Sequence, residues 1–443
     1  MNIYALSSGR GPSGIAIVRI SGKGTLKICE NLTKLKNIKS NEVNFCKFYN
    51  PKNDNIIDPE ALLLWFPGPN SYTGEDLAEL QIHGSNAIIK ALLRVLSEQK
   101  NCRLAEPGEF TKLAFQNDKI DLLKAESIGD LIHSETELQR QQAVKLVQGN
   151  ISNYYNDLRD KIIKSLAYIE AKIDFAEDDL PKKVLKEAHK SIKEIHKEIS
   201  NIIEDNKVGE KIRDGFRVSI TGEVNAGKSS LLNLLSKREV AIVSDEAGTT
   251  RDVIETYLNL DGYPVILADT AGIRDVKNEV EKKGISLAVG KSKEADLNIV
   301  VIDNSSKKIN NEIKKMINKD TIVLLNKSDV QNKQNHKFDA DTVLASVKDN
   351  KNIDKLINKI KEKLSLKFST QNVSVLITRE RHRVKLNECL KELDNFLKKD
   401  QSKDIELAAE DLRMATRHLG SIAGKVDVEE ILGSIFKDFC IGK

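Results

Sequence analysis

The stretch Gly222-Glu223-Val224-Asn225-Ala226-Gly227-Lys228-Ser229 decides the fold of the central part of this chain. Before it, Phe216, Val218 and Ile220 alternate with polar residues, which predicts a strand; after it, residues 229–235 predict the first turns of a helix. A glycine-rich turn between a strand and a helix lets backbone N–H groups surround phosphates, which the positive end of the helix also attracts. In this pattern Lys228 would reach the β- and γ-phosphates, and the Ser229 hydroxyl would hold Mg²⁺.

Two further elements predict the rest of a phosphate and metal site. The apolar run at residues 265–268 leads into Asp269-Thr270-Ala271-Gly272, where the Asp can support Mg²⁺ and the Gly amide can sense a γ-phosphate. Between this element and the glycine-rich loop lies Gly248-Thr249-Thr250-Arg251-Asp252, which offers hydroxyl groups to complete the metal shell.

Two more elements predict which base is bound. Asn326-Lys327-Ser328-Asp329 ends the apolar run at residues 321–325, and Ser346-Val347-Lys348 follows the run at residues 342–344. The Asp329 carboxylate can accept two hydrogen bonds from a guanine edge, whereas adenine cannot offer that pair of donors. A buried carboxylate that faces the wrong base would stay unpaired, at a cost of about 1–3 kcal/mol. The five elements together predict a GTP-binding domain.

The composition fits a globular protein of several domains. At 443 residues the chain is too long for one ordinary domain, and its 40% hydrophobic and 31% charged residues are ordinary proportions. The net charge of +4 is too small to indicate nucleic-acid binding by itself. The five cysteines lack the spacings of a zinc site or a disulfide framework, and no signal peptide or membrane-spanning run is present. We therefore expect a cytoplasmic protein that does not associate with membranes.

The patterning along the chain predicts an N-terminal α+β domain and a helical part. Residues 14–22 and 61–66 predict strands between turns, and residues 86–96 predict a helix. Apolar residues then recur at helical spacing on both sides of the GTP-binding part, at Leu158, Ile162, Leu166, Ile169 and Ile173, and at Leu386, Leu390, Leu393 and Leu397. Two separate helical segments are one interpretation. Because each stripe needs a partner to bury it, we favour one discontinuous helical bundle that carries an inserted Ras-like P-loop G domain.

The expected domains are residues 1–118, 119–213, 214–372 and 373–443, with linkers near Arg213 and residues 371–372. The most specific motifs lie outside the G domain. They are Ser71-Tyr72-Thr73-Gly74-Glu75-Asp76, Pro107-Gly108-Glu109-Phe110-Thr111 leading to Asn117-Asp118-Lys119, and the terminal Cys440-Ile441-Gly442-Lys443. With these motifs, the chain resembles the MnmE (TrmE) family of tRNA-modification GTPases over essentially its whole length.

The resemblance implies a function. The N-terminal domain of the family binds a tetrahydrofolate derivative (5-formyl- or methylene-tetrahydrofolate) and makes a homodimer. Family members form a heterotetramer with MnmG (GidA), and FAD is bound by that partner only. Together they use the folate one-carbon unit to add an aminomethyl or carboxymethylaminomethyl group to C5 of the wobble uridine of certain tRNAs.

The resemblance also assigns residues to the folate site. The family's contacts fall here on Arg19, Glu79, Lys119 and the terminal Lys443, and Cys440 is a possible participant in the chemistry. A pterin amide edge suits a carboxylate such as Glu79, and the glutamate tail of a folate suits Arg and Lys. Without the resemblance, Arg19 and Lys119 would be interpreted as ordinary surface charges.

For hydrolysis, the resemblance implies a potassium ion in the place of an arginine finger. The matching K⁺ ligands are Asn225, Ser244, Glu246 (through its carbonyl) and Thr249, and the matching Mg²⁺ ligands are Ser229 and Thr250. Ile273 stands at the usual glutamine position, and Glu281 matches the acidic residue that positions the attacking water, so the implied catalytic set is Glu281, Lys228 and Thr250. The full set of predicted GTP contacts is Asn225, Ala226, Gly227, Lys228, Ser229, Ser230, Ser244, Asp245, Glu246, Ala247, Gly248, Thr249, Thr250, Asp269, Thr270, Ala271, Gly272, Asn326, Lys327, Asp329, Ser346, Val347 and Lys348.

Two other functions are compatible with a G domain. A ribosome-assembly GTPase switch of the Era or Der type carries a C-terminal RNA-binding domain or a second G domain, and this chain contains one set of G-domain motifs. A purely regulatory switch is disfavoured by the large domain that precedes the G domain.

Overall fold

A computed structural model describes most of the chain. The described residues are 1–9, 11–174, 182–205, 207–238, 255–269, 295–306, 308–330, 336–368, 376–400, 404–426, 432, 435, 436, 439 and 442, with only the backbone described at 182–184, 238, 255, 268 and 269. The chain divides into two compact units. One comprises Met1–Gly129, Leu146–Asp174 and Ala409–Lys443, and the other comprises Asp130–Lys145 and Phe175–Ala408.

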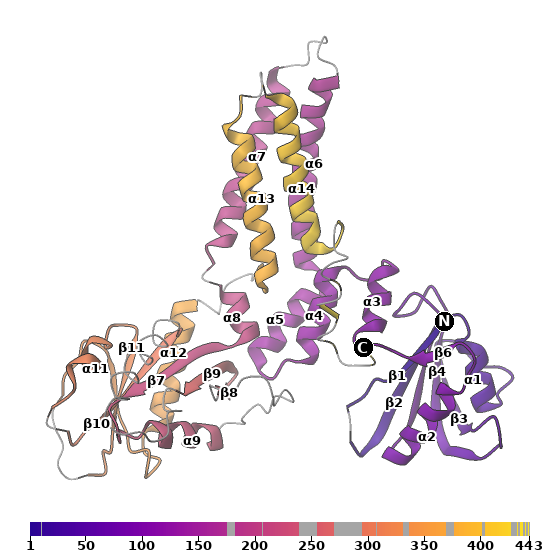
Figure 1. Ribbon diagram of the computed structural model, residues 1–443, viewed down its shortest axis with the longest axis horizontal. Helices are drawn as coiled ribbons and strands as arrows, with labels where there is room; N and C mark the ends of the chain where they lie inside the picture. Colours follow the sequence, from indigo (N-terminus) through magenta and orange to yellow (C-terminus); the bar gives the residue numbers. More distant parts are fainter. Residues whose placement is uncertain are drawn as a thin grey trace, which may run out of the picture. The chain divides into compact units, whose positions relative to one another are not determined.

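The first unit contains a six-stranded sheet with the order β3-β4-β5-β2-β1-β6 (Figure 1). Neighbouring strands are antiparallel, except that β1 and β6 are parallel. Its strands and two helices are β1 (Asn2–Leu6), β2 (Ser13–Ser21), α1 (Thr25–Thr33), β3 (Val43–Tyr49), β4 (Ile56–Phe66), β5 (Leu77–Gly84), α2 (Asn86–Ser97) and β6 (Cys102–Leu104). The two strands and the helix predicted for this region are confirmed.

Buried apolar residues stand at every second position of the strands, which explains why helices cover one face of this sheet. In β2 the buried residues are Ala16, Val18 and Ile20, every second position, and they join one apolar cluster with Leu32 of α1 and Leu92 of α2. Because successive side chains of a strand point to opposite faces, both helices pack on the same face of the sheet.

The rest of this unit is helical. Its helices are α3 (Glu109–Gln116), α4 (Leu122–Ile132), α6 (Asn150–Asp174) and most of α14 (Ile405–Ala423). The stripe predicted on α6 is buried at Leu158, Ile162 and Ile169. Although about 240 residues of sequence separate them, α6 and α14 are in contact, since Arg413 Nε donates to Glu170 Oε1 at 3.1 Å.

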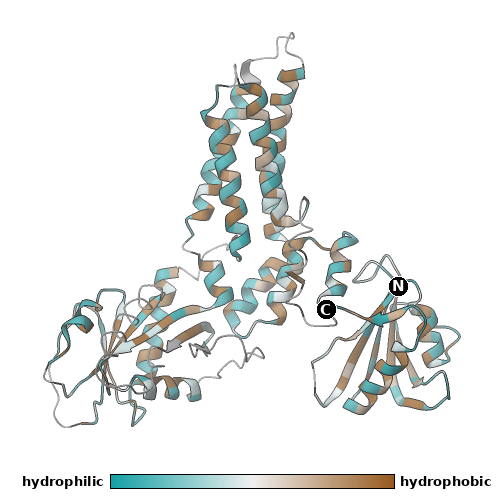
Figure 2. Cartoon of the chain, in the orientation of Figure 1, coloured by the Kyte–Doolittle hydropathy of each residue, from teal (hydrophilic) through white to brown (hydrophobic). Residues whose placement is uncertain are grey.

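The second unit contains the helices α5 (Glu137–Val147), α7 (Lys182–Ile203), α8 (Val208–Asp214) and α13 (Glu380–Lys398). Helices α7 and α13 lie side by side, and the hydropathy colouring shows the alternation of apolar and polar residues along them (Figures 1 and 2). The stripe predicted on α13 is only partly right, because Leu390 and Leu397 are half-buried. The buried face consists of Leu386, Cys389, Leu393 and Phe396.

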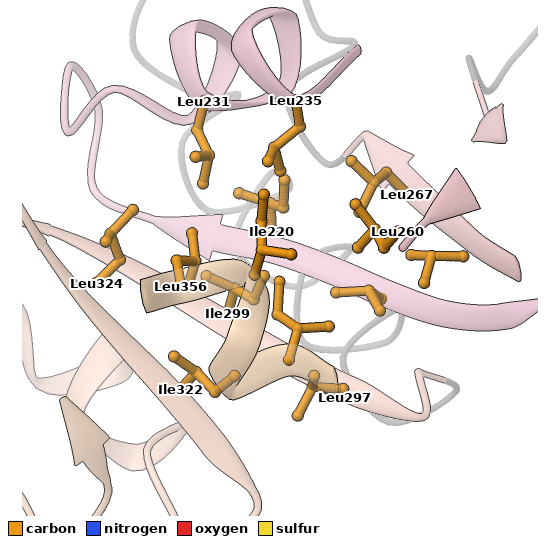
Figure 3. Close-up of a cluster of buried hydrophobic side chains, with 14 of the residues drawn as sticks. Ile220, Leu231, Leu235, Leu260, Leu267, Leu297, Ile299, Ile322, Leu324 and Leu356 are labelled. Atoms are coloured by element: carbon orange, nitrogen blue, oxygen red, sulfur yellow. The ribbon is translucent and has the colours of Figure 1, made fainter. Parts of the chain in front are cut away.

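The second sheet has the order β12-β11-β10-β7-β9-β8 and is parallel except for the β8–β9 hairpin. Its elements are β7 (Phe216–Gly222), α9 (Lys228–Arg238), β8 (Glu255–Leu260), β9 (Tyr263–Asp269), β10 (Leu297–Asp303), α11 (Asn311–Lys315), β11 (Thr321–Asn326), β12 (Asp341–Leu344) and α12 (Ile353–Phe368). Leu231 and Leu235 of α9 and Leu356 of α12 join one apolar cluster with alternate strand residues such as Ile299, so both helices pack on the same face of this sheet (Figure 3). The strand residues between them, such as Val300 and Val323, form a separate cluster on the other face with Ile313 of α11.

The fold class predicted from the sequence is confirmed: an α+β N-terminal domain, a discontinuous helical part and a P-loop α/β domain. The strands predicted before the glycine-rich loop and before Asn326 are β7 and β11. Among the residues that the structure describes, no helix combines the length and the apolar character needed to cross a bilayer.

Candidate functional site

The predicted phosphate loop follows β7 at the carboxyl edge of the parallel sheet, where ligands of such sheets bind. Two of its residues need backbone freedom. Gly222 has a φ of +146°, and a Cβ there would collide with the carbonyl oxygen of Val301 in the neighbouring strand. Gly227 has a φ of +102°, and a Cβ there would collide with the side-chain amide of Asn326. The loop therefore lies against two other strands and requires glycine at both places.

Lys228 begins α9, and its ammonium group turns back over the loop. Its Nζ donates to the carbonyl oxygens of Gly222 at 3.0 Å and Glu223 at 2.8 Å. Ser229 and Ser230 follow in the first helical turn and are exposed. A cation held above a ring of backbone amides at a helix start is the arrangement that receives a polyphosphate.

Asn326 connects the phosphate loop to the segment that follows β12. Its side chain is buried, with Nδ2 donating to the Ala226 carbonyl at 2.8 Å and Oδ1 accepting from the Val347 amide at 3.0 Å. One side chain thus fixes the distance between the predicted phosphate contacts and the predicted base contacts, which are far apart in the sequence.

Asp329 is exposed and held in place by Ser346, whose Oγ donates to Asp329 Oδ1 at 2.6 Å. This hydrogen bond, with the positive charges of Lys348 and Lys327, holds the pKa of the Asp329 carboxyl below its usual range. The carboxylate is therefore ionised at neutral pH, as required of a group that accepts two hydrogen bonds from a base.

Lys327 makes a contact that the sequence did not reveal. Its Nζ donates to Asp303 Oδ2 at 2.6 Å, and the other oxygen of Asp303 accepts from the amide and the hydroxyl of Ser305. Burial raises the pKa of Asp303, but the bonds from Lys327 and Ser305 outweigh it and lower this pKa below the ordinary value. One signal in the sequence could have indicated Asp303, because this residue ends an apolar run. That run forms β10, which lies in the sheet next to β7, the strand that precedes the phosphate loop.

Glu223 also has a partner that sequence reasoning missed. Its Oε1 accepts from the backbone amide of Asn310 at 2.6 Å, which ties the start of the phosphate loop to the segment before α11. Position 223 is one of the variable positions of the phosphate-loop pattern, so the motif did not indicate this contact.

In the first unit, the structure brings several predicted folate residues together. Arg19 on β2 and Glu79 on β5 face each other in register, and Arg19 Nη2 donates to Glu79 Oε1 at 2.7 Å. The guanidinium lies 5.3 Å from the ring centre of Tyr72 and 5.7 Å from that of Phe110. Both rings belong to the motifs that carried the family resemblance, but they were not predicted as contacts. The result is a half-buried charged pair flanked by aromatic faces.

The end of the chain reaches the same part of the first unit. Ser7 Oγ donates to the carbonyl of Gly442 at 2.9 Å, and Ala5, two residues earlier on β1, is the register partner of Arg19. The Lys119 side chain lies beside Gly74, where a Cβ would come within 3.2 Å of its Cε.

The remaining predicted site residues lie outside the residues that the structure describes. They are Ser244, Asp245, Glu246, Ala247, Gly248, Thr249, Thr250, Thr270, Ala271, Gly272, Glu281, Cys440 and Lys443, and Asp269 is described in its backbone only.

Comparison with solved structures finds G domains among the neighbours. The G domain of the T. maritima FeoB iron transporter is 24% identical with a TM-score of 0.26 and covers 34% of this chain and 98% of its own. The translation elongation factor SelB of Methanococcus maripaludis is 19% identical with a TM-score of 0.26 and covers 34% of each chain.

The comparison with families and curated proteins is decisive. A family model for the GTP-binding protein TrmE N-terminus matches residues 2–119, and one for the MnmE helical domain matches residues 122–440. The tRNA modification GTPase MnmE of Pelagibacter ubique (strain HTCC1062) is 56% identical over 449 residues and covers 100% of both chains. Proteins with that name from Rickettsia bellii (strain RML369-C) and Paramagnetospirillum magneticum are 42% and 41% identical and cover 100% of this chain and 99% of their own. This chain belongs to the MnmE family of tRNA modification GTPases.

Proposed function

We propose that this chain binds and hydrolyses GTP, and that hydrolysis drives modification at C5 of the wobble uridine of certain tRNAs. The single observation that carries the nucleotide part is the buried Asn326 side chain, which joins Ala226 of the phosphate loop to Val347 beside the base contacts. Asp329 adds guanine selectivity, because it is ionised, exposed and oriented by Ser346.

The loop fits the two metal ions that the family implies. The Ser229 hydroxyl is exposed at the start of α9, and we propose that it holds Mg²⁺ together with Thr250. Asn225 is exposed in the left-handed region, with a φ of +60°, and we propose that its amide oxygen binds K⁺ together with Ser244, the Glu246 carbonyl and Thr249. The ions would offset the charge that develops on the phosphates. Lys228 would hold the β- and γ-phosphates, and Glu281 would orient the attacking water.

The first unit fits a folate. A pterin is a flat ring with an amide edge, and Arg19, Glu79, Tyr72 and Phe110 provide a charged pair between aromatic faces. We propose that a tetrahydrofolate derivative binds here and supplies the one-carbon unit, with Lys119 and Lys443 on its glutamate tail and Cys440 nearby. We further propose a homodimer that forms a heterotetramer with MnmG, which carries the FAD, and a cytoplasmic location. A ribosome-assembly switch is disfavoured, because the matched family models cover both flanks of the G domain.

The test is complementation of a deletion strain, followed by mass spectrometry of the wobble nucleosides of its tRNA. The wild-type gene should restore the aminomethyl or carboxymethylaminomethyl uridine, and Glu281→Ala should not, although its protein should still bind GTP. Asp320→Asn removes an exposed carboxylate from the same domain and should behave as wild type. If the wild-type gene leaves the wobble uridines unchanged, the proposed function is wrong.

A further inference from the structure

A cavity of about 460 Å³ opens beside α11 on the G domain, a volume within the range of ligand sites. Its lining is basic and contains no acidic side chain: Lys308, Asn310, Asn311, Lys314, His336 and Lys337 surround it, with Ile309 and Phe338. The three lysines are exposed; Lys308 precedes α11, Lys314 lies on it, and Lys337 lies between β11 and β12.

The lysines of this cavity differ from some lysines of the same domain in their ion pairing. Within the part of the chain that the structure describes, none of Lys308, Lys314 and Lys337 has an ion-pair partner. By contrast, Lys315 pairs with Glu312 at 2.8 Å, and Lys359 pairs with Glu362 at 2.7 Å. No carboxylate among the described residues therefore neutralises the three lysines of the cavity.

The cavity also has an apolar floor and neutral donors. Phe338 is half-buried against the cluster that contains Ile309 and Ile313, so one face of its ring is fixed by packing. His336 Nε2 lies 3.1 Å from the carbonyl oxygen of Ser306, and because a carbonyl only accepts, that nitrogen carries the hydrogen. The rings of His336 and Phe338 lie 6.1 Å apart, so two planar groups border the lysines.

Unpaired lysines around an aromatic ring fit a phosphate-bearing chain with bases. Lysines neutralise backbone phosphates without reading sequence, whereas aromatic faces stack on unpaired bases. A free nucleotide is a poorer match, because the lysines surround an open cavity and no glycine-rich backbone turn lines it.

We propose that this cavity is a contact site for the sugar–phosphate backbone of RNA, an inference that rests on the proposed function in tRNA modification. Asn310 belongs to the lining and donates its amide to Glu223 of the phosphate loop, so RNA bound here contacts a segment that is tied to the nucleotide site.

The experiment measures the binding of unmodified tRNA to the full-length protein as a function of salt. One variant combines Lys308→Gln, Lys314→Gln and Lys337→Gln. The matched control combines Lys315→Gln, Lys359→Gln and Lys361→Gln, which removes the same charge from paired lysines of the same domain. Each phosphate contact contributes about 0.7–0.9 to the slope of log K against log salt, so the variant should lose about 2–3 of the slope and roughly 10–100-fold in affinity. The control should change little.

Photocrosslinking of the wild-type complex gives an independent readout, and crosslinks should fall on the peptide that contains Lys337 and Phe338. GTP affinity is measured for both triple variants to confirm that the G domain is intact. An equal fall of the slope in both variants, an unchanged slope in the cavity variant, or no tRNA binding by the wild-type chain would each overturn the site. The wobble-nucleoside analysis tests the proposed function separately, because the tRNA modification can be restored even if RNA does not contact this cavity.

Discussion

Asn326→Ala tests the connection between the phosphate loop and the base contacts. The side chain is 3% exposed, and the substitution removes both of its hydrogen bonds, to the Ala226 carbonyl and from the Val347 amide. Each backbone group left buried without a partner costs about 1–3 kcal/mol, so the two together cost about 2–6 kcal/mol. These groups lose their partners with or without nucleotide, so the free site should relax out of the arrangement that nucleotide needs. If binding must restore that arrangement at a cost of about 2 kcal/mol, the dissociation constant for GDP or GTP should rise about 30-fold.

The assay is the affinity and dissociation rate of a fluorescent guanine nucleotide, measured with the full-length protein. Two further variants sharpen it. Asn326→Asp keeps the acceptor for the Val347 amide but places a carboxylate oxygen against the Ala226 carbonyl, so it should lose as much affinity as Asn326→Ala. Asn358→Ala, at an exposed position of α12, is the control and should bind as the wild type does.

The two outcomes separate clearly. A loss of affinity that comes mainly from faster dissociation supports a side chain that holds the assembled site together. An Asn326→Ala protein that binds nucleotide within about 3-fold of wild type would refute the reasoning, because 3-fold corresponds to only about 0.7 kcal/mol.

Further predictions follow for other parts of the molecule. Asp329→Asn should shift binding from GTP toward xanthosine triphosphate, measured by competition, because an amide offers a donor where guanine needs an acceptor. GTP turnover should be faster in potassium than in sodium at equal ionic strength, and Asn225→Ala should remove the difference. Arg383→Ala removes the partner of the buried Glu210 carboxylate and of the half-buried Asp205 carboxylate, and it should lower the free energy of unfolding by about 3–5 kcal/mol in denaturant titration, whereas Arg413→Ala breaks exposed pairs and should cost at most about 1 kcal/mol. Iodoacetamide at pH 8 should modify the four described cysteines (Cys29, Cys46, Cys102 and Cys389) slowly in the folded protein and quickly in denaturant, because burial raises the pKa of these thiols and only a thiolate reacts; peptide mass spectrometry that finds them modified equally fast in both states would contradict this.

The sequence indicated β7, β9, β11 and β12 of the G domain, because each is an apolar run that leads into a polar motif, but it did not indicate β8 or β10. It predicted the α13 stripe less well, where Leu390 and Leu397 were expected to be buried and Cys389 and Phe396 are instead. Leu390 and Leu397 directly follow Cys389 and Phe396, so both pairs recur with the same period of seven residues. Which pair is buried depends on how α7 packs against α13. That packing is a tertiary property, which a pattern along one helix does not contain.

Contacts between distant segments were the part that sequence reasoning could not supply. Asn326 was identified as part of a base-recognition motif, but its bond to the Ala226 carbonyl depends on the order of strands in the sheet. Similarly, the approach of Gly442 to Ser7 depends on where the tail packs after α14. The family resemblance indicated that the terminal residues belong near the folate site, and only the fold places Gly442 beside the strand pair that carries Arg19.

The join between the G domain and the helices that precede it is closely packed within the second unit. The linker expected near Arg213 coincides with α8, and Val208 and Ile212 on this helix belong to the apolar core of the G-domain sheet. The other side of α8 is held by buried polar contacts. Arg383 of α13 bonds both oxygens of Glu210, at 2.9 and 2.6 Å.

Helix α5 makes the same kind of contact with α8 and with the β8–β9 hairpin. The side-chain amide of Gln142 donates to the Gly209 carbonyl at 3.0 Å, and the Leu138 amide donates to the Gly262 carbonyl at 3.3 Å, at the turn of the hairpin. The two strands of this hairpin continue, at their other ends, into the segments predicted to contact the γ-phosphate and the metal ions. Buried hydrogen bonds and ion pairs are costly to break, because their groups are left without partners. A displacement of the β8–β9 hairpin must therefore either move α5 with it or break the contacts of α5.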